Sequence, residues 1–170
     1  MKLNITIFIF CLFSLHGYSQ ETDKEASTTT YILVRHAEKD LSNPENKNPD
    51  LTEEGISRAN RLVKILKDIH IDMVYSTDYK RTLQTAAPIA KDRNIEIALY
   101  NPKKSYDETF KQKTRGKTTV IVGHSNSTPT FVNKIIGQKK YSSIDEKDYN
   151  KLFIISLQKD VITDMMLNFD

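Results

Sequence analysis

The sequence predicts an α/β sandwich of three layers, with a largely parallel central sheet and helices on both of its faces. Residues 31–34 and 118–122 are short apolar stretches rich in β-branched or aliphatic side chains, which is typical of buried strands. Amphipathic helical patterns lie between these and weaker strand patterns. Strands that alternate with helices favour a parallel sheet, because a crossover between parallel strands is usually a helix.

The composition is that of an ordinary globular domain. Of the 170 residues, 38% are hydrophobic and 28% are charged, and we assign residues 30–170 to a single domain. The formal net charge is +3, and charges of both signs are interspersed along the chain. This mild, mixed charge gives no reason to expect nucleic acid as a partner.

The N-terminus has the pattern of a secretory signal peptide. Lys2 is followed by an apolar run over residues 5–15, and the small residues Gly17 and Ser19 precede a polar stretch. We assign residues 1–19 to the signal peptide and expect a secreted or periplasmic protein. A membrane anchor is the alternative, but a helix over this run spans only about 16 Å, against a hydrocarbon core of about 30 Å. We therefore expect no stable membrane insertion after signal cleavage.

The segment that follows is polar, and the mature chain has no cysteine. We interpret residues 20–29 as a disordered lead-in to the domain. Cys11 is the single cysteine of the sequence and lies within the apolar run. The mature chain would therefore contain no disulfide, and its stability must come from its hydrophobic core.

The first predicted strand, residues 31–36, ends in Arg35 and His36. A surface loop rich in Asn and Pro follows over residues 40–50. Thr52 is a suitable N-cap for the next helix, in which apolar residues recur every three or four positions. These apolar residues are Ile56, Ala59, Leu62, Val63, Ile65, Leu66 and Ile69.

Residues 73–75 are predicted to form a second, short strand that leads into another helix. Thr77 or Asp78 can cap this helix. Arg81 then lies in its first turn, where free backbone N–H groups and the helix dipole favour an anion.

The middle of the chain is less regular. Pro88 should kink the second helix or start a new turn, and Asn94 is a suitable end for it. Residues 95–100 alternate weakly, which indicates a strand. The polar stretch 105–117 has room for one short helix over residues 107–113.

The last part of the chain combines a buried strand, a helix and a hairpin. The strand 118–122 ends just before His124, and a helix over residues 129–136 starts with a proline and is closed by a glycine. A polar loop then leads to two strands, 152–157 and 161–167, which we expect to form a terminal hairpin.

Two histidines and two arginines are the candidate chemical groups. His36 and His124 each follow a buried strand, Arg35 directly precedes His36, and Arg81 begins a helix. The carboxyl ends of parallel strands meet at one edge of a sheet, where α/β proteins bind their ligands. Guanidinium groups match phosphoryl oxygens in charge and geometry, so this set favours a phosphate ligand.

The motifs around these residues resemble those of the histidine phosphatase superfamily, the phosphoglycerate-mutase-like group. The resemblance runs in order from about Tyr31 to Ser127 and favours the smaller first branch, as a small secreted member. The second branch typically has Arg-His-Gly and a late His-Asp, whereas here Ala37 follows the first pair and Ser125 follows His124. The matching motifs are 33–38, 51–55 with Arg58 and Ala59, 75–77, 80–82, 84–86 and 122–125.

This resemblance implies that His36 is the nucleophile, and that Arg35, Arg81 and His124 bind the phosphoryl oxygens. Imidazole attacks only when it is neutral, and the two neighbouring guanidinium groups disfavour its protonation. A protonated His124 would add positive charge against the transferring phosphoryl group. These roles require no cofactor and no metal, and histidines without nearby cysteine make a poor metal site.

A proton donor for the leaving group is harder to choose. First-branch relatives commonly place a Glu between the second arginine and the second histidine. The candidates are Glu96, Asp107 and Glu108, and we choose Glu108 because Glu96 lies in a predicted strand. Asp107 remains an alternative, as does Glu38, which is two residues from His36. An enzyme without a dedicated acid is a further possibility and would suit a good leaving group.

The predicted function is that of a metal-independent histidine phosphatase, a phosphoric monoester hydrolase acting through phosphorylated His36. Its substrate would be a small phosphorylated molecule or a phosphoprotein. A phosphoglycerate mutase would need a large cap, and the 42 residues between Arg81 and His124 are mostly used by a helix and strands. A non-catalytic phosphate- or phosphoprotein-binding module on the same fold is the other alternative, although binding alone does not need a free nucleophile.

Overall fold

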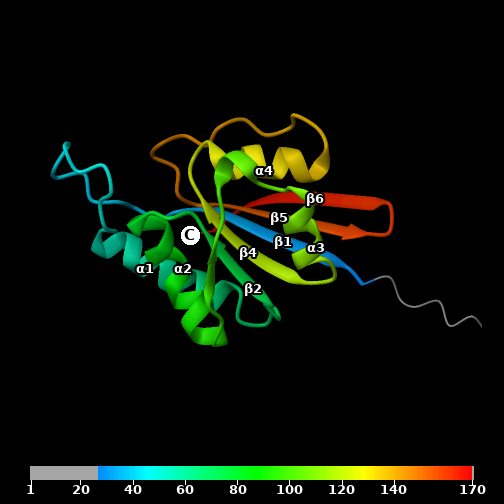
Figure 1. The fold of residues 1–170 in the computed structure, drawn as a ribbon. Coiled ribbons are helices and arrows are strands. Elements are labelled where there is room, and N and C mark those ends of the chain that lie inside the picture. Colours follow the sequence, from blue (N-terminus) through cyan, green and yellow to red (C-terminus); the bar gives the residue numbers. More distant parts are fainter. Residues whose placement is uncertain (1–26, 170) are drawn as a thin grey trace, which may run out of the picture.

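The computed structural model describes residues 27–169, and a six-stranded sheet forms its centre (Figure 1). The strand order is β3-β2-β4-β1-β5-β6; the first four strands are parallel and the last two run antiparallel to their neighbours. The predicted largely parallel sheet is therefore confirmed. The strands are β1 (Thr29–Arg35), β2 (Met73–Ser76), β3 (Ile97–Leu99), β4 (Thr118–Gly123), β5 (Lys151–Gln158) and β6 (Val161–Asn168).

Helices cover both faces of this sheet, as the three-layer prediction requires (Figure 1). The strand β1 shows why, because its apolar side chains alternate between the two faces. Ile32 and Val34 pack with α1 (Glu53–Ile65) and α2 (Lys80–Arg93). Tyr31 and Leu33 pack with α3 (Glu108–Thr114) and α4 (Ser127–Ile136) on the opposite face. A short 3₁₀ helix, η1 (Pro102–Lys104), precedes α3.

The first helix agrees with its sequence pattern at its start and is shorter at its end. Thr52 is the N-cap of α1, and its hydroxyl accepts a hydrogen bond of 3.1 Å from the backbone N–H of Gly55. The helix ends at Ile65, and a turn carries the chain onward. Ile69 still packs against the same hydrophobic cluster, which explains why it continues the apolar pattern.

The start of α2 differs from the prediction. Tyr79 occupies the N-cap position and makes no capping hydrogen bond through its side chain, so neither Thr77 nor Asp78 caps the helix. The hydroxyl of Thr77 is used elsewhere, as described below. The helix runs through Pro88 as one element and ends at Asn94, whose φ of 53° is the left-handed conformation typical of such an end.

The remaining elements follow the prediction with small shifts. The helix α4 begins at Ser127, two residues earlier than the predicted start. Strands β5 and β6 form the expected hairpin, and Lys159 adopts a φ of 52° in its turn in place of a glycine. The loop over residues 40–50 is closed at its base by an isolated bridge between Lys39 and Leu51.

The predicted signal peptide, residues 1–19, lies outside the described residues, as does most of the predicted lead-in. Thr29, the last residue of the predicted lead-in, already belongs to β1 and pairs with Leu157, so the ordered domain includes at least this residue of the lead-in. Within residues 27–169, no helix has the length and apolar character needed to cross a bilayer.

One glycine fixes the distance between α1 and the segment that follows β1. A Cβ atom added to Gly55 would lie 2.3 Å from the backbone carbonyl oxygen of Glu38, closer than any van der Waals contact allows. The same carbonyl accepts a hydrogen bond of 2.9 Å from the backbone N–H of Thr52. The first turn of α1 therefore packs directly on the backbone two residues beyond His36.

We predict that Gly55→Ala destabilises the protein, although alanine is the better helix former by about 1 kcal/mol. Backbone atoms must move to admit the new Cβ, and such overpacking costs about 1–3 kcal/mol. Urea unfolding measures the change in the free energy of unfolding. The exposed Ser57→Ala in the same helix is the matched control and should be neutral or slightly stabilising. Stabilisation by Gly55→Ala would contradict the close approach.

Candidate active site

The two histidines lie together because β1 and β4 end side by side. In their parallel register Arg35 is opposite Gly123, so the next residues along the two strands are His36 and His124. The backbone N–H of His36 donates to the carbonyl oxygen of Gly123 over 2.9 Å, which continues the ladder by one step. The two imidazole rings have centroids 5.5 Å apart. The structure thus brings both predicted histidines to one edge of the sheet.

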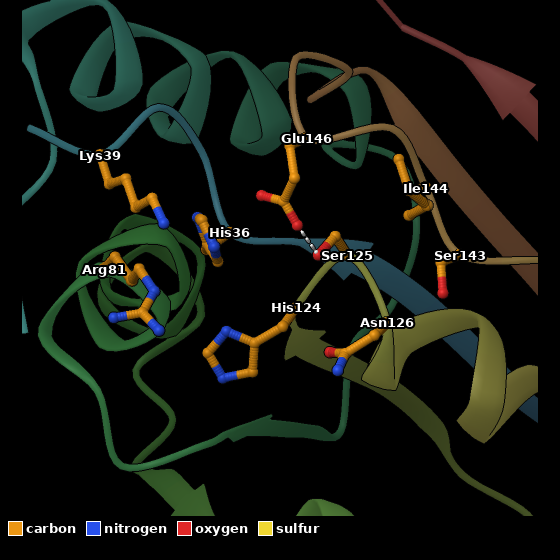
Figure 2. A pocket seen from close by; sticks show the side chains of 9 residues that line it. All are labelled: His36, Lys39, Arg81, His124, Ser125, Asn126, Ser143, Ile144 and Glu146. Atoms are coloured by element: carbon orange, nitrogen blue, oxygen red, sulfur yellow. Dashed lines mark hydrogen bonds between the residues drawn. The ribbon is translucent and has the colours of Figure 1, made fainter. Parts of the chain in front are cut away.

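A pocket of about 470 Å³ opens beside the two rings (Figure 2). Cationic and polar side chains form most of its wall, contributed by strand ends, the start of α2 and the segment between α4 and β5. The lining residues are His36, Lys39, Arg81, His124, Ser125, Asn126, Ser143, Ile144 and Glu146.

His36 has the tautomer that a nucleophile needs. Its Nδ1 lies 2.7 Å from the carbonyl oxygen of Ala37, which can only accept, so Nδ1 carries the proton. The Nε2 atom consequently has a free electron pair. Burial lowers the pKa of His36 to about 3, and the charges of Arg35, His124 and Arg81 contribute further. The ring is therefore neutral near pH 7, with desolvation rather than neighbouring charge as the main cause.

A short hydrogen-bond chain fixes the ring of His124. The hydroxyl of Thr82 donates to backbone carbonyls and accepts from the hydroxyl of Thr77 over 3.0 Å. Because the proton of Thr77 is used in this way, its oxygen accepts from Nε2 of His124, which lies 3.0 Å away. This assigns the proton of the neutral ring to Nε2. The Nδ1 atom is then unprotonated and faces His36 and Arg81 (Figure 2).

The charge of His124 differs from the sequence-based expectation. Burial lowers its pKa to about 4, and the charges of Arg81, Arg35 and Lys39 lower it further, while Glu146 has the opposite effect. His124 is therefore neutral near pH 7 in this site, whereas we expected a protonated ring. Burial is the main reason for the difference, and the surrounding cations add to it more than Glu146 offsets.

Arg81 presents an incompletely paired cation to the pocket. Its Nε and Nη1 atoms are buried and have no hydrogen-bond partner among residues 27–169, and its guanidinium carbon lies 4.5 Å from the centroid of the Tyr79 ring. Thr85 connects this helical turn to the segment after His36, because its hydroxyl donates to the carbonyl of Arg81 and accepts from the N–H of Ala37. An arginine held so, with unused donors, is suited to bind an oxyanion.

Arg35 is buried behind the pocket and does not line it. Its Nη1 donates to the carbonyl oxygens of Asp145 and Asp148 over 2.8 and 2.9 Å, and its Nη2 forms an ion pair of 2.7 Å with Glu146. The guanidinium carbon also lies 4.2 Å from the centroid of the Tyr149 ring. Arg35 therefore holds the segment 145–149 in place.

Several pocket residues were not among our predicted site residues. Lys39 lies three residues after His36, and that closeness could have signalled it. Ser125 and Asn126 directly follow His124, so their position was equally readable. Glu146 lies in an irregular segment with no periodic pattern, and no sequence signal pointed to it.

The predicted proton donor lies outside this pocket. The carboxylate of Glu108 is on the surface, 79% exposed, and pairs with Lys111 over 2.7 Å. Asp107 caps α3 by accepting from the N–H of Phe110. Glu38 forms an ion pair of 2.8 Å with Arg58 in a largely buried position. Among residues 27–169, the carboxylate that lines the pocket is that of Glu146.

The described part of the chain holds no group of three or more His, Cys, Asp or Glu side chains arranged to bind a metal ion. The donors that gather at the pocket are instead cationic or neutral nitrogens and hydroxyls, which bind oxyanions.

A model of the histidine phosphatase superfamily, branch 1, matches residues 31–101. This range includes Arg35, His36 and Arg81, and the fold adds His124 to them across the β1–β4 pair. Over this range the chain matches the histidine phosphatase superfamily. Its motifs at residues 33–38, 51–55 and 75–86 lie within the matched range, and His36 and Arg81 from these motifs line the pocket described above.

Phosphoserine phosphatase 1 of Hydrogenobacter thermophilus is a curated protein with a similar sequence. The two sequences are 42% identical over 71 residues, which is 39% of this chain. The alignment spans 33% of the relative's length, so it extends over about one third of that protein.

Solved structures with the same fold extend the similarity to most of the chain. A protein histidine phosphatase, SixA, solved with tungstate, is 13% identical, with a TM-score of 0.64, and the match covers 82% of this chain and 96% of that one. A phosphoserine phosphatase mutant from Entamoeba histolytica, solved with phosphoserine, is 18% identical, with a TM-score of 0.61 and coverage of 82% and 96%. These matches establish the shared fold.

We predict that the two buried histidines make stability depend on pH between about 4 and 6.5. Unfolded histidine has a pKa near 6.5, above the values of about 3 and 4 for His36 and His124, so unfolding takes up protons in this window. Stability is therefore full above pH 6.5 and falls as the pH decreases. Near pH 5 each histidine contributes a slope of about 1.4 kcal/mol per pH unit.

Urea unfolding at a series of pH values measures this slope. His36→Gln and His124→Gln should each flatten it by about one proton near pH 5. His70→Gln replaces an exposed histidine outside the pocket and serves as the control. An unchanged slope in both pocket variants would contradict the lowered pKa values.

Proposed function

We propose that this protein is a phosphatase that hydrolyses phosphate monoesters through a covalent phosphohistidine on His36. The observation that supports this most directly is the tautomer of His36, whose free Nε2 electron pair lies in a pocket bounded by cations. A structural histidine would be expected to use both ring nitrogens in hydrogen bonds, whereas a nucleophile must keep one free.

The charge of the pocket suits a phosphoryl group. A phosphate monoester carries nearly two negative charges near pH 7. Arg81 has two buried nitrogens without partners, and the ammonium of Lys39 lies on the same wall. We assign Arg81, Lys39 and His124 to the phosphoryl oxygens, with Arg35 contributing through its Nη2 atom. Such preorganised donors stabilise charge in the transition state without reorganisation.

The protonation of His124 would follow substrate binding. Its Nδ1 atom faces the pocket, and its pKa is low because the ring is buried and because Arg81, Arg35 and Lys39 lie near it. A phosphoryl dianion would offset these charges and raise the pKa, so the ring would take up a proton and donate it to a phosphoryl oxygen. Binding should therefore be accompanied by proton uptake.

The reaction then proceeds in two displacements at phosphorus. The Nε2 atom of His36 forms a bond to phosphorus as the ester P–O bond breaks. The leaving oxygen departs as an anion and takes its proton from solvent water. Water next attacks the phosphohistidine, the N–P bond breaks, and inorganic phosphate and neutral His36 are restored. The hydrogen bond from Nδ1 to the Ala37 carbonyl stabilises the positive charge that develops on the ring.

The relatives support this function and suggest its substrates. One relative is named a phosphoserine phosphatase, and two proteins with the same fold were solved with phosphoserine and with tungstate, a phosphate-like oxyanion. We extend this to the present chain as activity on a small phosphorylated molecule or a phosphoprotein.

We predict that the protein hydrolyses p-nitrophenyl phosphate, and that His36→Ala lowers kcat by more than about 10³-fold because the nucleophile is lost. Absorbance at constant pH measures turnover, and circular dichroism checks that the variant is folded. A chelator should leave the rate unchanged, because the proposed groups are all side chains. A folded His36→Ala variant with wild-type activity would rule out the covalent route. A phosphate-binding module would bind phosphate in both proteins without turnover.

We further predict that Glu108→Ala changes kcat/KM by less than about twofold across aryl phosphates of differing leaving-group pKa, because its carboxylate lies outside the pocket. In both proteins the rate should fall as the leaving group becomes more basic, since the one carboxylate at the pocket is ionised. Kinetics on a series of substituted phenyl phosphates measure this dependence. A selective loss on poor leaving groups in the variant would instead assign proton donation to Glu108.

A further inference from the structure

An anionic side chain of the pocket wall already binds two donors, one on the wall itself and one directly behind it. The carboxylate of Glu146 accepts from the hydroxyl of Ser125 through Oε1 (Figure 2). Its Oε2 lies 2.7 Å from Nη2 of Arg35. The carboxylate has two oxygens and a negative charge. It therefore offers these donors the same kind of acceptor as two oxygens of a phosphoryl group.

The other hydrogen bonds of Arg35 belong to the backbone. Its Nη1 atom is taken by the carbonyls of Asp145 and Asp148, which shape the segment 145–149. Glu146 holds one N–H of Nη2, and its negative charge lies beside the donors that a phosphoryl oxygen would approach. Arg35 can therefore bind a phosphoryl oxygen through Nη2 more favourably when the carboxylate of Glu146 moves.

Glu146 is free to make that movement. Its side chain is 70% exposed, so rotation into water buries no group and leaves no cavity. Its backbone segment is held independently, because the N–H of Ile144 donates to the carbonyl of Ser125 over 2.9 Å and Arg35 binds the carbonyls on either side. The carboxylate can leave while the segment stays in place.

The charges around the carboxylate favour both its seated position and its replacement. The hydrogen bond from Ser125 lowers the pKa of Glu146, and the charges of Arg35 and Lys39 lower it further, so the group is ionised near pH 7. A phosphoryl dianion carries more charge and would also reach Arg81. It can thus outcompete the carboxylate, at the cost of breaking the two contacts of Glu146.

We propose that Glu146 is a built-in competitor for the phosphoryl group, whose carboxylate leaves Arg35 and Ser125 when substrate binds and returns when phosphate departs. This inference rests on the proposed function, since it places the phosphoryl group in the same pocket. Glu146 thereby sets the affinity of the site and limits inhibition by the product, because inorganic phosphate must hold the same donors against the returning carboxylate.

Calorimetric titration with inorganic phosphate at pH 7.5 tests this on the full chain, independently of turnover. Glu146→Gln keeps the shape and removes the charge, and it should bind phosphate about tenfold more tightly, the order of a single lost competing charge contact. Glu146→Ala removes the group altogether and should also tighten binding. Glu45→Gln is the matched control, since Glu45 is exposed in the loop 40–50 and its carboxylate has no ion-pair partner among residues 27–169; it should leave the affinity unchanged.

Steady-state kinetics add a measurement that a merely structural role would not produce. In Glu146→Gln, KM for p-nitrophenyl phosphate and the inhibition constant of phosphate should both fall, each by a similar factor. If Glu146 only held the segment 145–149, its loss would weaken phosphate binding and raise KM. Unchanged or weaker binding in both Glu146 variants, with the wild type binding phosphate, would overturn the inference alone. If wild type and Arg81→Ala bind phosphate equally poorly, the site itself is misassigned and the proposed function fails with it.

Discussion

The site depends on the parallel, in-register pairing of β1 with β4. That pairing sets Arg35 opposite Gly123 and so brings His36 beside His124, although 87 residues of chain lie between them. Side chains alternate along a strand, and a slip of one residue in this register would turn one ring away from the other. Packing in turn specifies the register, because both faces of β1 are buried against helices. A slip of one residue would move the side chains of each face into the cluster on the opposite face. The pairing of β1 with β4 therefore determines both the centre of the sheet and the position of the two histidines.

Burial that stabilises the sheet also determines the protonation of the site. Desolvation disfavours the imidazolium form of both histidines, and the surrounding cations act in the same direction. The protein therefore places neutral imidazole rings beside an incompletely paired guanidinium group. Burying that positive charge is unfavourable until an anion binds. Arg81 illustrates the cost, since two of its buried nitrogens have no partner and its contact with the Tyr79 ring offsets only part of that loss. The folding stability that these unpaired donors cost is regained when a phosphoryl group binds them, and it contributes to the affinity for that group.

Much of the fold could be predicted from the sequence, because buried strands and amphipathic helices leave periodic patterns that tertiary packing then preserves. The ends of β1 and β4 were identifiable for the same reason, and with them both histidines. Caps at α2 were not, because Thr77 is used by the His124 hydrogen-bond chain and not by the helix. Glu108 was chosen by its place along the chain, which does not say that its side chain lies on the surface. Glu146 lies in an irregular segment, and only the folded chain brings it to Arg35.

Arg35 contributes both to the fold and to the charge of the site. Its planar guanidinium group binds two backbone carbonyls with one nitrogen and Glu146 with another, and a lysine could not reproduce that fork. The same side chain therefore shapes the segment 145–149 and supplies a positive charge to the pocket. A buried arginine that served only as scaffold could end on carbonyls alone, whereas one aimed only at a ligand would leave its donors unused, as Arg81 does. The exposed carboxylate on Nη2 fits neither case. It fits an arginine that is held in place, keeps its charge paired, and can exchange that partner for a phosphoryl oxygen.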